Sequence, residues 1–388
     1  MNATATDYRV FPKLNKLEFS QQEPGYVVLC DPDRQQYFRV GEREAGFIRG
    51  LDGTRTLGQI QQDHQPAFHP NQAIQLIDWL ADNELLAGSG RIAGPVSLKE
   101  RVLNWLFRGR KPFRLHLASP DPLLRRLPLA RLFDTKARIA YWLLALMPII
   151  CLLIEPGVAQ RLANSVRHPL GAAQFLAIVA IILFTTVIHE LAHAAACIHF
   201  GGRVNKIGIM IMYLMPAFYC DISASWSFRS KAERIIVASA GLIAHAVQAG
   251  MLFLLWVQTD MATFLFASLI CYSLIMLNLL PFIKLDGYWI LVHILGEPNL
   301  RARSISYLIG MVCSPRARRE PGNVVFAYFG AALVLGSLGF FIMGLFSVHN
   351  LLGYLSKTLA DGVAVVLCII AAIRVSSYLF QELKEKKA

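Results

Sequence analysis

Residues 183–202, LFTTVIHELAHAAACIHFGG, combine a long apolar run with ionisable side chains. His189, Glu190 and His193 form an HExxH pattern in this run. Because residues four apart share one face of an α-helix, both imidazoles can bind one zinc ion, and Glu190 can act as general base on a nearby water molecule. Ionisable residues are costly inside a membrane span, so their presence indicates a function. The stretch therefore predicts a membrane helix that carries a metal site.

A zinc hydrolase needs a third protein ligand, and two residues are candidates. His199 follows His189 by ten residues, the spacing of HExxHxxGxxH enzymes, but Ala196 stands where a glycine would bend the chain back. A continuing helix would place His199 roughly 15 Å along the axis from His189, which favours a cap or interface role. We therefore favour Asp286, which lies in NLLPFIKLDGYWIL (278–291) at a proline-broken span end that antiparallel packing can bring beside the histidines. A helix cap in a polar turn is the alternative for Asp286.

The composition of the 388-residue chain is that of a membrane protein, with 55% hydrophobic residues, 16% charged residues and a net charge of +12. Soluble proteins carry roughly 25% charged residues. The apolar excess excludes a disordered scaffold. The seven cysteines are scattered and form no CxxC pair, so we expect neither a disulfide framework nor a thiolate zinc site. The N-terminal sequence also leads us to expect no cleavable signal peptide.

Long apolar runs predict an α-helical polytopic membrane domain over residues 139–388, with about six transmembrane helices. The expected spans are 139–154, 170–198, 235–257, 262–283, 324–346 and 359–380. A shorter apolar segment, 207–219, contains Pro216, and we expect it to be re-entrant or an edge segment. Lysine and arginine gather in the segments that would share one side of the membrane. The positive-inside rule therefore predicts that both termini are cytoplasmic.

Residues 96–138 form a predicted basic amphipathic linker on the membrane surface. Its basic side chains alternate with aromatic residues such as Trp105 and Phe113. This pattern suits a segment that lies on an anionic bilayer.

Residues 1–95 are expected to form a separate, soluble α+β domain. Two β-rich runs, Tyr26–Cys30 and Gln36–Val40, predict a hairpin. Helices are expected at about 42–51, 56–64, with Thr56 as a possible cap, and 70–87. A hairpin with three helices predicts a small winged-helix domain. Because this region holds 12 acidic and 9 basic residues, it lacks the basic footprint of DNA binders, and no nucleic acid partner is expected.

The two motifs on membrane segments resemble the site-2 protease family of intramembrane zinc metallopeptidases, over roughly residues 139–295. That family pairs HExxH with an N-x-x-P-x-x-x-x-D-G pattern, which Asn278, Pro281, Asp286 and Gly287 match. The resemblance implies that one zinc ion per chain is bound by His189, His193 and Asp286. It also implies that Glu190 is the catalytic base and that Asn278 is a catalytic residue that helps to hold the substrate or transition state.

One departure from the family pattern concerns the substrate site. Many members have an asparagine in a span between the two motifs, whereas ASAGLIAHAVQAG (238–250) offers His245. His245 can replace the asparagine as a hydrogen-bond donor to substrate, or it can be a packing histidine, and both interpretations stay open. Tyr219 and Pro281 are further candidates for substrate binding, Tyr219 because segment 207–219 can offer an edge to an extended peptide.

Two further stretches, 218–241 and 285–304, resemble the bacterial peptide zinc metalloprotease branch of that family. Residues 10–87 resemble the PqqD-like winged helix, a module that recognises the leader peptides of ribosomally made peptides. These resemblances imply a metalloendopeptidase of the bacterial cytoplasmic membrane that matures such a peptide, with the leader bound as an added strand at the N-terminal sheet. One alternative is a site-2-type protease that cleaves a membrane-anchored regulator such as an anti-sigma factor. Another is a non-enzymatic membrane receptor or export partner with a structural zinc, against which Glu190 counts.

Overall fold

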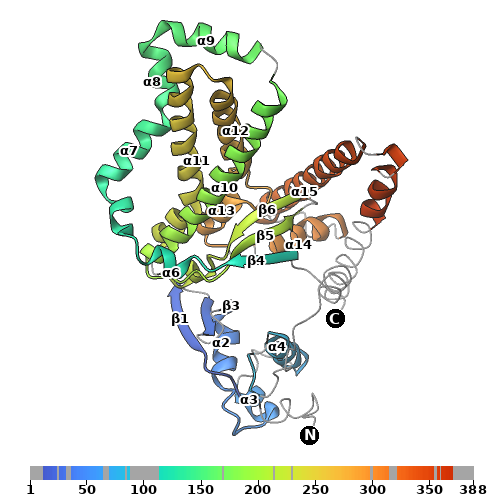
Figure 1. Cartoon of the computed structure of the whole chain (residues 1–388). Coiled ribbons are helices and arrows are strands. Elements are labelled where there is room, and N and C mark those ends of the chain that lie inside the picture. The colour runs from blue at the N-terminus through green and yellow to red at the C-terminus, as the bar shows by residue number, and fades with distance from the viewer. Residues whose placement is uncertain are drawn as a thin grey trace.

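The computed structural model describes residues 12–23, 26–31, 36–63, 70–83, 85–87, 113–167, 170–212, 215–228, 230–297, 300–313, 321–353, 356–358 and 360–369. The chain is mostly helical (Figure 1). A small N-terminal region of strands and helices lies at one end of a larger helical region, on the side where a second small sheet is found (Figure 1).

The N-terminal region contains an antiparallel sheet of three strands in the order β1-β2-β3. The strands are β1 (Glu18–Glu23), β2 (Tyr26–Asp31) and β3 (Gln36–Gly41). The predicted hairpin is confirmed, because β2 pairs with β3 and Leu29 stands opposite Phe38. Strand β1 was not expected from its sequence, EFSQQE, because it contains one apolar residue and no alternation. Antiparallel pairing with the buried strand β2 allows β1 to form although its own sequence has no alternating apolar pattern.

Three helices follow the sheet, as the sequence predicts. They are α2 (Glu42–Arg49), α3 (Leu57–Asp63) and α4 (Pro70–Asp82). Phe47, Ile60 and Ile77, one from each helix, are fully buried in the same apolar cluster as Leu29 of β2. The N-terminal region therefore has a core of its own, and its assignment as a winged helix stays a prediction.

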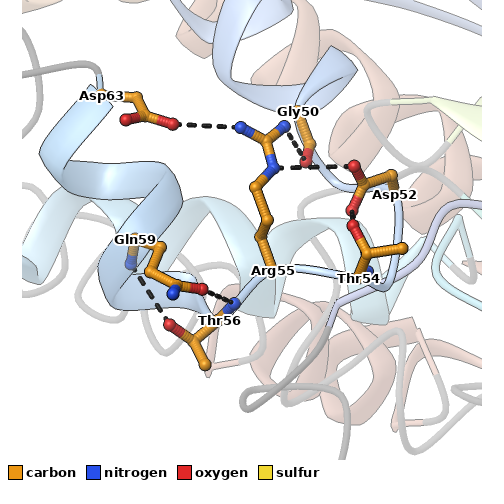
Figure 2. A network of polar contacts seen from close by, with 7 residues as sticks. All are labelled: Gly50, Asp52, Thr54, Arg55, Thr56, Gln59 and Asp63. Atoms are coloured by element: carbon orange, nitrogen blue, oxygen red, sulfur yellow. Dashed lines mark hydrogen bonds and ion pairs between the residues drawn. The ribbon is translucent and has the colours of Figure 1, made fainter.

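A polar network fixes the start of α3 (Figure 2). The backbone N–H of Gln59 donates to the Thr56 hydroxyl over 3.3 Å, and the backbone N–H of Thr56 donates to the Gln59 side-chain oxygen over 2.9 Å. This reciprocal pair is a capping box, and it confirms Thr56 as the cap. The Arg55 guanidinium donates to Asp63, at the other end of α3, and to the carbonyl oxygen of Gly50, so it links the helix to the loop before it.

Three helices among the described residues are long and apolar enough to cross a membrane, or four if one bent pair is a single span. The three are α10 (Ala172–His199), α11 (Lys231–Thr259) and residues Val325–Asn350 of α15 (Pro321–Gly353). The bent pair is α7 (Thr135–Ala145) and α8 (Met147–Ile154), with a bend of 57° at the break between them. These helices fit a membrane protein.

One expected span is shorter than the apolar run that predicts it, and another is described only in part. Helix α12 (Ala262–Asn278) has 17 residues, because the chain leaves the helix before Pro281. The last apolar run is described only as a short helix, Ala360–Ile369, and residues 370–380 lie outside the described residues. The expected number of six spans therefore stays a prediction.

A second antiparallel sheet lies against α10 and has the order β4-β5-β6. Its strands are β4 (Phe113–Ala118), β5 (Ile207–Met212) and β6 (Met215–Cys220). The 207–219 segment, expected to be re-entrant or an edge segment, forms the β5–β6 hairpin, and β6 is an edge strand. Strand β4 comes from the predicted linker. The linker also supplies α6 (Asp121–Leu124) and the 3₁₀ helix η1 (Leu129–Phe133), which both contact α10.

Helix α11 is the centre of the helical region and contacts α7, α10, α12 and α13 (Asp286–Leu295). The remaining elements are α9 (Pro156–Arg167), the 3₁₀ helix η2 (Ser223–Ser227) and α14 (Leu300–Cys313). The N-terminal strands β1 and β3 contact η2, which follows β6 directly in the chain. The N-terminal sheet therefore contacts the segment that follows strand β6, at one end of the helical region (Figure 1).

Candidate metal centre

Three side-chain atoms from two distant parts of the chain converge in the helical region. The Nε2 atoms of His189 and His193 are 3.2 Å apart, and the Asp286 Oδ2 atom lies 3.1 Å from the first and 3.4 Å from the second. Both histidines are 4% exposed, and the Asp286 side chain is 18% exposed. Among the described residues, His189, His193 and Asp286 form the group of three histidine, cysteine or acidic side chains whose ligand atoms lie close enough together to hold one metal ion.

The two histidines are brought together by local helix geometry. They lie four residues apart on α10, which continues without a break to His199. Asp286 is brought to them by a break in the chain, since α12 ends at Asn278 and α13 starts at Asp286 itself. Gly287 allows this turn to close, because a Cβ atom there would collide with the backbone of Leu279. The packing that we expected from the sequence therefore brings Asp286 beside the HExxH helix.

The three atoms fit a zinc ion. With Zn–N and Zn–O bonds of about 2.1 Å, the ligand atoms of a tetrahedral site lie about 3.4 Å from one another. The three measured separations fall at or just below that value. The buried Oδ2 atom of Asp286 has no hydrogen-bond partner among the described residues, which would be costly unless a cation sits among the three atoms. Two imidazoles with one carboxylate are also a donor set of catalytic zinc sites.

His193 is oriented by the backbone of α11. Its Nδ1 atom lies 2.7 Å from the carbonyl oxygen of Val237. A carbonyl oxygen can only accept, so Nδ1 carries the proton, and in the neutral ring Nε2 keeps its lone pair. Gly241, one turn further along α11, packs against the rings of both histidines, and a Cβ atom there would overlap them. Val237 and Gly241 could not be singled out from the sequence, because no pattern within α11 reveals that these positions face α10.

Glu190 lies next to His189 in the chain and is half-buried. Its carboxylate faces the backbone N–H of Cys220, the last residue of β6. Burial, followed by the negative charge of Glu190, raises the pKa of the Cys220 thiol well above its usual value. The thiol therefore stays protonated, and a protonated thiol is a poor metal ligand. The edge strand β6 thus ends beside the predicted general base.

His245 is buried on α11, on the far side of His189 from the converging atoms. Its Nδ1 atom lies 3.1 Å from Nδ1 of His189, whereas Nε2 of His189 faces Asp286. Of the two interpretations left open by the sequence, neither foresees this contact with a predicted ligand.

The other predicted site residues lie around the centre. The Tyr219 hydroxyl is 2.9 Å from Nδ1 of His116 on β4, and Gly208 of β5 pairs with both residues, so no side chain separates them. The Asn278 amide donates to the Leu274 carbonyl of its own helix over 3.0 Å. Pro281 lies in the turn between α12 and α13. The substrate roles of Tyr219, Asn278 and Pro281 stay predictions.

His199 is not part of the converging group. Its ring stacks on Phe133 of η1, with the ring centroids 4.3 Å apart. The unbroken helix carries His199 past the two ligands, which is the physical reason that we gave against it as third ligand. The HExxHxxGxxH alternative therefore does not describe this site.

Comparison with known proteins identifies a relative whose name states a related activity. The chain is 31% identical over 128 residues to the Bacillus subtilis (strain 168) protein named "Putative peptide zinc metalloprotease protein YydH". The match covers 32% of this chain, and it spans half the length of that relative. No protein-family model matches the chain, and no solved structure matches it significantly. The similarity supports a relationship to zinc metalloproteases, for which the converging His–His–Asp group is a suitable metal site.

Proposed function

We propose that this chain is an intramembrane zinc metalloendopeptidase of the site-2 protease type. The observation that carries the proposal is the convergence of His189, His193 and Asp286 within 3.4 Å, with Glu190 directly beside the first of them. A structural zinc site needs no such base, and it is usually closed by four protein ligands. Three protein ligands leave one position open, as in catalytic sites.

The protein residues have distinct parts in the proposed reaction. A bound zinc ion would supply Lewis-acid chemistry, which polarises a peptide carbonyl and makes water more acidic. Glu190 takes the proton of the attacking water and later gives it to the leaving amine. The Cys220 N–H faces the Glu190 carboxylate and can orient it, and the surrounding helices limit the access of bulk water.

The substrate is proposed to bind as an extended peptide along β6. A helical substrate hides its carbonyls in internal hydrogen bonds, so the segment around the cut must be unfolded. Strand β6 lies at the edge of its sheet and ends at Cys220, next to Glu190. A peptide that adds to this edge would be guided toward the proposed base by main-chain hydrogen bonds.

The substrate class that we favour is a ribosomally made peptide whose leader binds the N-terminal domain. Strands β1 and β3 contact η2, which begins three residues after β6 ends. A leader held at the N-terminal sheet would therefore deliver the following residues close to β6. The proposed location is the bacterial cytoplasmic membrane, with both termini on the cytoplasmic side, in agreement with the basic connections between the spans.

Co-expression with a candidate precursor peptide tests the proposal. Mass spectrometry should find a cleaved product with the unchanged chain and at least about 100-fold less product with Glu190→Gln, since a general base contributes about 10²–10⁴-fold. Identical products from both proteins would contradict a peptidase and would favour a receptor or export partner with a structural zinc. Cleavage of a membrane-anchored regulator that has no leader would favour the anti-sigma-type substrate instead.

A further inference from the structure

His245 lies on α11 and is 1% exposed. It is 56 residues from His189 in sequence, yet the Nδ1 atoms of the two rings are 3.1 Å apart. This distance is that of a hydrogen bond between two ring nitrogens, so one of them donates and the other accepts.

The direction of this hydrogen bond follows from the position of Asp286. Nε2 of His189 points at the converging group and needs a free lone pair to bind a metal ion, so the proton of neutral His189 must be on Nδ1. His189 is then the donor, and Nδ1 of His245 is the acceptor. The proton of neutral His245 must in turn be on Nε2, a buried atom with no hydrogen-bond partner in the part of the chain that the structure describes.

The two ligand histidines are therefore held by two different acceptors on α11. His193 donates from Nδ1 to a main-chain carbonyl, which is present whatever the side chain at position 237. His189 donates from Nδ1 to a side chain, so its orientation depends on which residue stands at position 245. Partners of this kind fix the tautomer of a ligand and raise its basicity toward the metal.

We propose that His245 is a positioning residue for the metal centre, whose Nδ1 atom accepts the Nδ1–H of His189 and keeps the Nε2 lone pair of His189 directed at zinc. The inference rests on the proposed zinc site and assigns His245 a part that neither substrate binding nor simple packing requires. Removal of such a partner typically costs about 10–100-fold in metal affinity.

Two isosteric substitutions separate the roles of the two ring nitrogens. In His245→Asn the side-chain amide lies where Nδ1 was, so an acceptor for His189 remains, while the group at the Nε2 position is lost. In His245→Gln the amide lies where Nε2 was, and the acceptor for His189 is lost. His245→Leu removes both groups, and His199→Asn is a control for the loss of a histidine from the same region outside the converging group.

The experiment measures zinc affinity of the full-length chain in detergent, by competition with a chromophoric chelator, and the visible absorption of the Co²⁺-loaded protein. We expect His245→Asn and His199→Asn to stay within about threefold of the unchanged chain. His245→Gln and His245→Leu should bind zinc about 10–100-fold more weakly and should show an altered Co²⁺ spectrum. Thermal unfolding of the metal-free proteins checks that all variants are folded.

Two results would overturn the proposal. Equal affinity in all variants would show that His189 needs no acceptor from position 245. An equal loss in His245→Asn and His245→Leu would indicate that the imidazole serves packing alone. The affinity readout is independent of proteolysis, so the positioning role can hold even if Glu190→Gln leaves the products unchanged and the peptidase proposal fails.

Discussion

The ring of His193 on α10 is hydrogen-bonded to the main chain of α11, with 2.7 Å between its Nδ1 atom and the carbonyl oxygen of Val237. One turn further along α11, Gly241 lies against the rings of both His193 and His189. The metal centre is therefore built at the contact between two helices, and its geometry depends on how closely their backbones approach.

Gly241→Ala is expected to damage the metal centre without removing a ligand. The added methyl group would overlap both imidazoles, so one ring or the helix must shift. We expect zinc affinity to fall by at least about 10-fold, as for the loss of a partner that orients a ligand. Gly339→Ala is the matched control, because a Cβ atom at Gly339 of α15 meets no atom within 4 Å. Equal zinc binding in the two variants would contradict the contact that we describe.

Asp286→Asn should reduce zinc affinity more than any variant of His245. The amide keeps the shape of the carboxylate but removes the negative charge next to both histidines. We expect a loss larger than the roughly 10–100-fold typical of a residue that only orients a ligand. Metal analysis of the purified protein after dialysis measures the loss, and His199→Asn is expected to retain its zinc. If Asp286→Asn retained zinc and His199→Asn lost it, the choice of the third ligand would be wrong.

Proline replacements in the substrate test whether it binds to β6 as a strand. Proline has no N–H to donate to a neighbouring strand, so replacements next to the cut should block cleavage at the positions where the substrate pairs with β6. Alanine at the same substrate positions should be accepted, because it leaves the main-chain hydrogen bonds intact. Product ratios from mass spectrometry compare the two series. Cleavage of all proline variants at the normal rate would rule out pairing with β6.

Thr56→Ala is expected to weaken the start of α3 in the N-terminal domain. The substitution removes the acceptor for the Gln59 N–H, and the loss of such a cap costs about 0.5–2 kcal/mol. Hydrogen exchange of the full-length chain should therefore become faster in the first turn of α3. Gln62→Ala is a control on the exposed part of the same helix. Unchanged exchange in Thr56→Ala would indicate that tertiary packing alone maintains this turn.

Much of the candidate site could be predicted from local patterns. The spacing of His189 and His193 and the unbroken apolar run around them are properties of one helix, and the hairpin of β2 and β3 is a property of neighbouring segments. Strands β1 and β4 were not predicted, because each depends on a partner strand that the local sequence does not reveal. The pairing of β4 with β5 joins segments far apart in the chain, which is why residues 113–118 were interpreted as part of a linker.

The sequence by itself therefore determined which side chains share one face of α10 at the candidate site, since the placement of an i, i+4 pair of histidines is a consequence of helix geometry. Only the tertiary structure separated the positions of Asp286 and His199, because the unbroken α10 carries His199 onto Phe133 while the turn before α13 brings Asp286 to the histidines. The tertiary structure alone also placed Val237, Gly241 and His245 against the ligands. These contacts arise where separate helices pack together, and the free energy of that packing comes from burial between segments whose register no local pattern encodes.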